Sequence, residues 1–314
     1  MSDRRPVGVV GARGHTGAEL VRLICDHPSL ELIFAGSREL AGQPVPGVEG
    51  LAFGPIDAGV VANLAADVVI LALPDGASDP HVAVIDDDTV IIDISADHRF
   101  DDSWAYGLPE LNRESLRGAT RIANPGCYAT AMQIALAPLL DSISGVPAVC
   151  GVSGYSGAGA TPGPRNDTER LRDNLMPYKL VGHNHEREAI RQLGIELRFM
   201  PHVHPAFRGL IVTAHIPLAE AMTAGEIISR FQHRYGDEPL VEIRDEIPEL
   251  RDGAGHPGVI IGGIETSANG LNAVVVAAED NLLKGAAVQA IQNLNLALGF
   301  PEFDGLVAEI ASES

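Results

Sequence analysis

The first third of the chain alternates short apolar runs with segments whose apolar positions recur every three or four residues. Continuous apolar runs at 6–12, 30–37, 67–74 and 89–95 predict buried strands, and residues 15–27 have the spacing of an amphipathic helix. Buried strands separated by helices are typical of a parallel sheet that is covered on both faces. We therefore expect a Rossmann-type α/β domain in this part of the chain.

The pattern changes close to residue 127, where strand-like runs begin to follow one another with fewer helices between them. This arrangement predicts a second, α+β domain built on a mixed or antiparallel sheet. The expected helices are 128–140, 185–194, 223–236 and 281–299, and the expected strands begin at 147 and span 196–203, 209–218 and 271–280.

Two helix boundaries carry recognisable signals. Thr223 followed three residues later by Glu226 forms a capping box, and Gly194 is placed to close the helix before it.

Composition narrows the classes of function. The chain has 314 residues, enough for two domains, and a net charge of −20 from 42 acidic and 22 basic residues. This balance argues against nucleic acid and against anionic membranes as partners. The N-terminal stretch reaches glycines before any long apolar run, and no apolar run is long enough to cross a bilayer. With only two lysines, Lys179 and Lys284, Schiff-base chemistry is disfavoured.

Three cysteines are present, without the spacing of a zinc site or a disulfide framework. We expect Cys25 and Cys150 to lie in the core, no metal site, and a reducing, cytoplasmic location.

A glycine-rich loop joins the first predicted strand to its helix. Gly11, Gly14 and Gly17 allow a tight turn and a close approach of backbone N–H groups to a pyrophosphate. A turn without a ligand is the alternative. At the end of the second strand, Ser37 and Arg38 occupy the place of the acid that binds the ribose of NAD, which favours NADP(H). Glu31 and Glu39 lie nearby and keep NAD open.

Cys127 differs from the other two cysteines. It follows Asn-Pro-Gly and directly precedes a predicted helix, whose N-terminus favours a thiolate and offers N–H groups to an oxyanion. The segment "GHNHERE" at 182–188 offers histidines and glutamates for proton transfer, although a metal site or a solvated helix start is also compatible with it. Arg208 is a candidate anchor for an anionic substrate.

Ten motifs along nearly the whole chain resemble those of the N-acetyl-γ-glutamyl-phosphate reductases, NADPH-dependent enzymes of arginine biosynthesis. The motifs are "GARGHTGAEL", "GSRELAG", "ALPDGAS", "IIDISADHRF", "YGLPEL", "NPGCYAT", "SGYSGAG", "GHNHERE", "PHVHPAFRGL" and "DNLLKGAAVQAIQNLNLALG".

This resemblance implies a glyceraldehyde-3-phosphate-dehydrogenase-like fold, with a cofactor domain at 1–126 and 285–314 and a catalytic domain at 127–284. Cys127 would be the nucleophile that forms a thioester, His183 the acid/base and Glu188 its partner. NADP(H) would contact Gly11, Arg13, Gly14, His15, Thr16, Gly17, Ser37, Arg38, Ser156, Gly157 and Asn281. The acyl-phosphate substrate would contact Arg99, Asn124, His185 and Arg208.

The chain departs from the family pattern at three positions: Asp75, Ala129 and Arg187 stand where the family usually has His, Pro and Pro. These departures affect peripheral contacts. Aspartate-semialdehyde dehydrogenase and N-acetyl-aminoadipyl-phosphate reductase are alternative activities, and an NADP-binding sensor without turnover is an alternative of another class. We also expect a homo-oligomer, a dimer or a tetramer.

Overall fold

A computed structural model describes residues 4–306 of the chain and divides it into two compact units. One unit runs from the N-terminal part to Gly126 and resumes at Ala286, and the other runs from Cys127 to Gly285. Residues 1–3 and 307–314, the two ends of the expected cofactor domain, lie outside the described residues. Among the described residues, no helix is both long and apolar enough to span a membrane.

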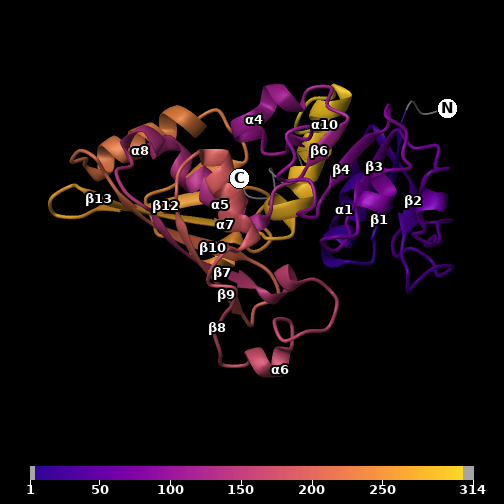
Figure 1. Cartoon of the computed structure of the whole chain (residues 1–314), viewed down its shortest axis with the longest axis horizontal. Coiled ribbons are helices and arrows are strands. Elements are labelled where there is room, and N and C mark those ends of the chain that lie inside the picture. The colour runs from indigo at the N-terminus through magenta and orange to yellow at the C-terminus, as the bar shows by residue number, and fades with distance from the viewer. Residues whose placement is uncertain (1–3, 307–314) are drawn as a thin grey trace. The chain divides into compact units, whose positions relative to one another are not determined.

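The first unit is built on a six-stranded parallel sheet in the order β2-β1-β3-β4-β6-β5 (Figure 1). Its strands are β1 (Arg5–Val10), β2 (Leu30–Gly36), β3 (Val68–Leu71), β4 (Val90–Asp93), β5 (Ala105–Tyr106) and β6 (Arg121–Ala123). Its helices are α1 (His15–Asp26), α2 (Ala58–Val61), α3 (Asp79–Val82), α4 (Pro109–Leu116) and α10 (Val288–Leu298). The expected parallel Rossmann-type sheet is confirmed.

The second unit contains a mixed seven-stranded sheet in the order β11-β12-β13-β10-β7-β9-β8. Its strands are β7 (Ala148–Gly154), β8 (Met176–Pro177), β9 (Arg198–His204), β10 (Leu210–Pro217), β11 (Val241–Ile243), β12 (Val259–Thr266) and β13 (Asn272–Glu279). Its helices are α5 (Cys127–Leu136), α6 (Thr168–Leu171), α7 (Asn184–Leu193), α8 (Ala224–Tyr235) and α9 (Leu250–Gly253), with 3₁₀ turns η1 (Ala137–Ser142) and η2 (Tyr155–Ala158).

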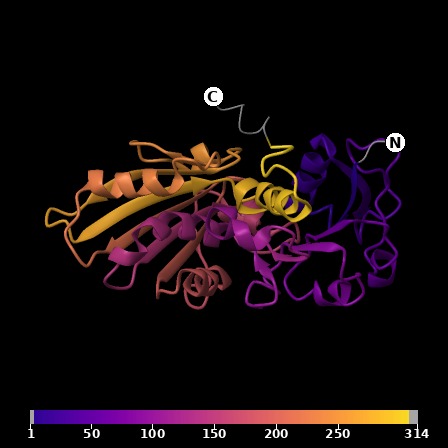
Figure 2. The same ribbon diagram turned by 90° about the horizontal axis from the view of Figure 1, so that it is seen from above.

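One face of this second sheet is covered and the other is open. Helix α5 packs on β10 and β13, and α8 packs on β12, as Figure 2 shows for α8 beside the long strands. On β10, Val212 and Ala214 point to the helices and are fully buried, whereas Thr213 and His215 are exposed. The alternation gives strand β10 one solvent-facing side in the single chain.

Two cysteines are not where the apolar pattern places them. Cys25 and Cys150 are both exposed, so their expected burial is wrong. On α1, Ile24 is buried and Cys25, one residue further around the helix, faces outward. Cys150 belongs to the open face of the sheet, opposite the buried Val149.

The long helix expected over 281–299 is shorter. A π-helical turn, η3 (Leu283–Ala287), precedes α10, which begins at Val288. Such turns are rare and frequently lie at functional sites. The boundaries at Thr223 and Gly194 are confirmed, with both halves of the capping box formed and Gly194 in the left-handed region at φ 68°.

Asp93, at the carboxyl end of β4, is the centre of a buried polar network in the first unit. Its carboxylate accepts hydrogen bonds from Ser78 Oγ at 2.8 Å, from the backbone N–H and Oγ of Ser95 at 3.0 and 2.8 Å, and from His98 Nδ1 at 2.6 Å. The His98 ring stacks on Trp104 with centroids 3.9 Å apart. The network therefore fixes the loops that follow β3 and β4.

We predict that Asp93→Asn lowers the free energy of unfolding by about 2–4 kcal/mol, because buried donors lose a charged acceptor. Asp79→Asn is the matched control. Asp79 also contacts His98, at 3.2 Å, but its side chain is 85% exposed, so its loss should cost less than about 1 kcal/mol. Urea unfolding measures both, and equal effects of the two variants would contradict the role given to Asp93.

Candidate functional site

The loop between β1 and α1 approaches its neighbours so closely that only glycine fits. Gly11 has φ +91°, and a Cβ there would lie 2.2 Å from the carbonyl oxygen of Ala72. A Cβ at Gly17 would lie 2.3 Å from the carbonyl oxygen of Gly11. Both glycines are thus required by the turn itself.

The N-terminus of α1 is suited to an anion. Gly14 is the N-cap, no side chain caps the helix, and the first turn, with His15 and Thr16, contains no acid. The helix dipole at this end favours a phosphate, and no acidic side chain of the first turn opposes it. This helix start, together with the cradle that a Cβ would fill, fits the pyrophosphate of a dinucleotide.

The turn after β2 holds the residues expected at the ribose. Ser37 is buried and its Oγ accepts the N–H of Leu40 at 3.1 Å, while Arg38 is exposed. Glu39 pairs with Arg13 of the glycine loop, Nη1 to Oε2 at 2.8 Å. The ion pair thus joins the glycine loop to the turn after β2, a contact that the sequence did not predict.

In the second unit, Cys127 is the first residue of α5 and is partly exposed, whereas every later residue of that helix is buried. A Cβ added at Gly285 would lie 2.6 Å from the Cβ of Cys127 and 2.8 Å from Oε1 of Glu279. The backbone of the π-helical turn therefore packs directly against the cysteine, and Glu279, fully buried, lies close to both.

His183 is the N-cap of α7 and is 7% exposed. Its Nδ1 accepts the backbone N–H of His185 at 3.1 Å, so the neutral ring carries its proton on Nε2. His185 is half-buried, with its ring centroid 4.8 Å from that of His183. The expected pair of histidines is therefore brought together at the start of one helix.

The two glutamates of this motif have different positions. Glu188 is fully buried on α7. Glu186 accepts the N–H groups of Gly182 at 3.3 Å and Phe199 at 2.9 Å, which ties the start of α7 to β9. Glu186 therefore stabilises the local fold and is not assigned to proton transfer.

Two tyrosines complete the surroundings of Cys127 and were not among the expected site residues. The ring of Tyr178 lies 5.5 Å from that of His183. Burial and then the charge of the Cys127 thiolate raise the pKa of Tyr178 well above its usual value. Burial likewise raises the pKa of Tyr128, whose hydroxyl donates to the carbonyl of His202 at 2.8 Å. Both phenols therefore stay neutral and able to donate. Tyr128 follows Cys127 directly in the sequence, whereas no local sequence signal marks Tyr178.

Three of the residues expected to contact NADP(H), Ser156, Gly157 and Asn281, lie next to one another. Asn281 donates from Nδ2 to Ser156 Oγ at 2.8 Å and accepts the N–H of Gly209 at 3.0 Å. A Cβ at Gly157 would lie 3.7 Å from the same Asn281 amide nitrogen. Ser156 and Asn281 are almost completely buried.

Arg208 is held by an acid that the sequence did not single out. Its Nε lies 2.8 Å from Oδ2 of Asp280, which is fully buried. The same carboxylate accepts the N–H groups of Gly255 at 2.7 Å and Leu282 at 2.8 Å. Burial raises the pKa of Asp280, and these hydrogen bonds and the Arg208 charge offset part of that rise. Asp280 therefore orients the guanidinium of Arg208.

Arg99 and Asn124 lie in the first unit and have internal partners. Arg99 donates from Nε to the carbonyl of Asn124 at 2.8 Å and from Nη2 to that of Ile94 at 2.7 Å. Asn124 donates to the carbonyl of Ala286 at 3.2 Å and accepts from Asn293 at 3.0 Å. Both residues thus join the carboxyl ends of β4 and β6 to the segment that enters α10.

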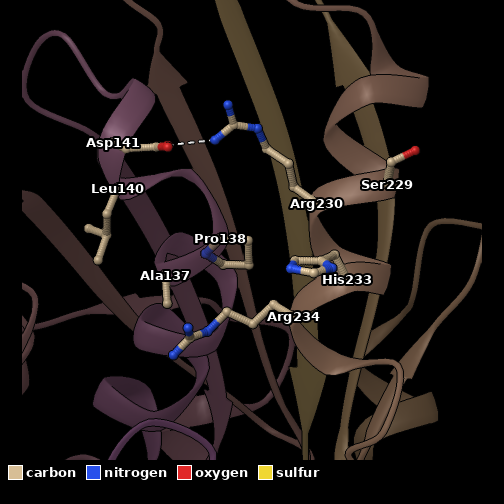
Figure 3. A pocket seen from close by; sticks show the side chains of 8 residues that line it. All are labelled: Ala137, Pro138, Leu140, Asp141, Ser229, Arg230, His233 and Arg234. Carbon is tan, nitrogen blue, oxygen red and sulfur yellow. Dashed lines mark hydrogen bonds and ion pairs between the residues drawn. The ribbon is translucent and has the colours of Figure 1, made fainter.

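A hollow of about 520 Å³ between η1 and α8 contains none of the expected site residues. Figure 3 shows Arg230 of α8 directed at Asp141 of η1, 2.5 Å away. Within the part of the chain that the structure describes, no group of three or more His, Cys, Asp or Glu residues could hold a metal ion.

Comparison with known proteins identifies the family. A semialdehyde dehydrogenase NAD binding domain matches residues 6–119, and a semialdehyde dehydrogenase dimerisation domain matches residues 127–281. The N-acetyl-gamma-glutamyl-phosphate reductase of Xanthomonas campestris pv. campestris (strain 8004) is 54% identical over 308 residues, covering 96% of this chain and 98% of that protein. This chain belongs to the N-acetyl-γ-glutamyl-phosphate reductase family.

A second relative supports the family assignment, and two solved structures support the fold. The reductase of Xylella fastidiosa (strain 9a5c) is 52% identical over 96% of this chain and 92% of that protein. Aspartate semialdehyde dehydrogenase II complexed with ASA from Vibrio cholerae has a TM-score of 0.77 at 18% identity, covering 95% of this chain and 99% of that chain. The Candida albicans aspartate semialdehyde dehydrogenase with NADP gives 0.71 at 15% identity, over 94% and 98%. At these identities the structures show the shared fold, and with it the expected glyceraldehyde-3-phosphate-dehydrogenase-like class.

We predict that Gly285→Ala reduces turnover by at least about tenfold, because its methyl group displaces Cys127 or the Glu279 carboxylate, and sub-ångström errors of position are costly in catalysis. The rate at which iodoacetamide alkylates Cys127 should change as well. Gly225→Ala on α8 is the control, since a Cβ there meets nothing within 4 Å. Turnover and alkylation rates unchanged in Gly285→Ala would contradict the close packing against Cys127.

Proposed function

We propose that this protein reduces N-acetyl-γ-glutamyl phosphate with NADPH, releasing N-acetylglutamate semialdehyde and phosphate, as a cytoplasmic enzyme of arginine biosynthesis. The observation that carries the proposal is Cys127 at the start of α5, packed against the glycine of a π-helical turn, in a chain 54% identical to a reductase of this name. We assign the pyrophosphate and ribose of the cofactor to the parallel-sheet unit, and the acyl-transfer chemistry to Cys127 of the second unit.

Cys127 begins the reaction as a thiolate, which the N-terminal dipole of α5 favours. Its sulfur attacks the acyl carbon, the bond from carbon to the phosphate oxygen breaks, and a thioester remains on Cys127. We assign stabilisation of the oxyanion to the first N–H groups of α5, because the helix begins at Cys127. NADPH, when bound through the Gly11–Gly17 loop, Ser37, Arg38, Ser156, Gly157 and Asn281, supplies the hydride that reduces the acyl carbon.

Collapse of the resulting hemithioacetal breaks the carbon–sulfur bond, releases the aldehyde and restores the thiolate. His183 handles the proton in this cycle through Nε2, because Nδ1 is occupied by the N–H of His185. The buried Glu188 acts as its partner. Arg208, oriented by Asp280, binds an anionic group of the substrate, and we assign a substrate contact to His185 as well. Arg99 and Asn124 are the residues of the first unit that we assign to substrate contact.

The related semialdehyde dehydrogenases share this fold and are the second candidate. Assays in the oxidative direction, with phosphate and NADP⁺ and each of three semialdehydes, separate them: those of N-acetylglutamate, aspartate and N-acetyl-aminoadipate. The proposal requires N-acetylglutamate semialdehyde to be the best substrate. A clear preference for one of the other two semialdehydes would replace the proposed activity.

Cys127→Ser should lower turnover by at least about 10³-fold while leaving the dissociation constant of NADP⁺ within about twofold, because covalent catalysis is lost and the cofactor contacts are not. Turnover in the phosphate-dependent assay and calorimetric titration of NADP⁺ measure the two effects. Cys25→Ser, at an exposed cysteine of α1, serves as the control and should keep full activity. Full turnover by Cys127→Ser removes the cysteine from the mechanism, and absence of any turnover in the wild type supports a sensor.

We further propose that the open face of the second sheet carries the contact of a homo-oligomer, a dimer or a tetramer. Cys150, Met200, Thr213 and His215 are exposed on adjacent strands β7, β9 and β10, in a region that matches a dimerisation domain. Because this face is open in the single chain and exposes the apolar side chain of Met200, we expect a second copy of the chain to cover it.

Thr213→Arg should therefore convert the protein to monomers of 33.0 kDa, because a charge is buried without a partner at the centre of the contact. Ser229→Arg, on the exposed side of α8, is the control and should leave the oligomer intact. Light scattering coupled to size exclusion gives both masses, and an unchanged mass for Thr213→Arg places the contact elsewhere.

A further inference from the structure

The ion pair between Arg13 and Glu39 joins the two segments that the proposed function assigns to the cofactor. Arg13 comes from the glycine loop after β1, and Glu39 from the turn after β2, and the two side chains are 39% and 63% exposed. The turn is closed by the hydrogen bond from the Leu40 N–H to Ser37 Oγ at 3.1 Å, which leaves Arg38 and Glu39 exposed at its tip.

The turn after β2 therefore brings together a carboxylate, which suits NAD, and arginines, which suit NADP. In Rossmann-type domains the end of the second strand binds the adenosine ribose, where a carboxylate accepts the 2′-hydroxyl of NAD and an arginine binds the 2′-phosphate of NADP. This chain has Arg38 and Glu39 in succession, and Glu39 also neutralises Arg13. A 2′-phosphate brought to this turn gains from both arginines and is repelled by the glutamate.

We propose that Glu39 is a specificity-determining residue that weakens the preference of this protein for NADP(H) over NAD(H). In the free protein Glu39 forms an ion pair with Arg13, and this ion pair has to break before the guanidinium can bind the 2′-phosphate. Exposed ion pairs contribute little stability, so a dianionic phosphate can displace this one. With NAD(H), Glu39 keeps Arg13 and can accept the 2′-hydroxyl. The inference depends on the proposed cofactor site and adds how that site discriminates.

The test is Glu39→Gln in the full-length protein, with two probes that differ only in the 2′-phosphate: adenosine 2′,5′-bisphosphate and 5′-AMP. Isothermal titration calorimetry gives the dissociation constants, and NADP⁺ and NAD⁺ are titrated in parallel. The bisphosphate and NADP⁺ should bind about three- to tenfold more tightly to Glu39→Gln, because removing one unit charge near a partly exposed phosphate has this order of effect. 5′-AMP should not gain, and NAD⁺ should bind equally or more weakly.

Two further variants make the test specific. Glu31→Gln removes the same charge from an exposed position at the start of β2 and should change no ratio, which controls for the net charge of −20. Arg13→Gln should weaken binding of the bisphosphate, and adding Glu39→Gln to it should produce a smaller gain than in the wild type, since part of the effect acts through Arg13.

An unchanged ratio of bisphosphate to 5′-AMP affinity in Glu39→Gln overturns the inference, as does an equal gain in Glu31→Gln. In either case NADP⁺ binding by the wild type would leave the proposed function standing. Failure of the wild type to bind NADP⁺ or NAD⁺ overturns the proposed function and the inference together. Thermal unfolding of each variant verifies that the fold is retained.

Discussion

The close packing of the Gly285 backbone on Cys127 is the constraint on which the second unit depends. A side chain at position 285 would collide with both Cys127 and Glu279, so the π-helical turn can approach the first residue of α5 only as glycine. This approach leaves Cys127 partly exposed at a helix N-terminus while the rest of α5 is buried. The thiol is thus presented on a rigid element, with its position set by backbone atoms.

Buried polar side chains of the second unit fix the orientation of the other residues that we assign to the reaction. Asp280 and Asn281 follow one another after β13, and they hold Arg208 in one direction and Ser156 in the other. His183 caps α7 through the same nitrogen that fixes its tautomer. Each of these side chains has a structural bond that also orients a group assigned to the reaction, so that orientation does not depend on a substrate.

In the first unit, too, close approach of the backbone shapes the proposed binding site, in this case the site for a dinucleotide. Glycines bring the backbone of the loop after β1 close to its neighbours, and no side chain caps the start of α1, to which we assign the pyrophosphate. The turn after β2, by contrast, is exposed and carries charges of both signs. Recognition of the common part of a dinucleotide is therefore built into the backbone, whereas discrimination at the ribose depends on surface charges.

Local signals in the sequence determined the buried strands of the first unit, the glycine loop, the capped ends at Thr223 and Gly194, and Cys127 after a Pro-Gly turn, because each depends on neighbours within a few residues. They failed for Cys25 and Cys150, which lie on exposed faces of otherwise apolar elements, and for the π-helical turn before α10. Only the tertiary structure brought Asp280 to Arg208 and Glu39 to Arg13. These contacts join segments distant in the chain, and short-range periodicity contains no information about which distant side chains will meet.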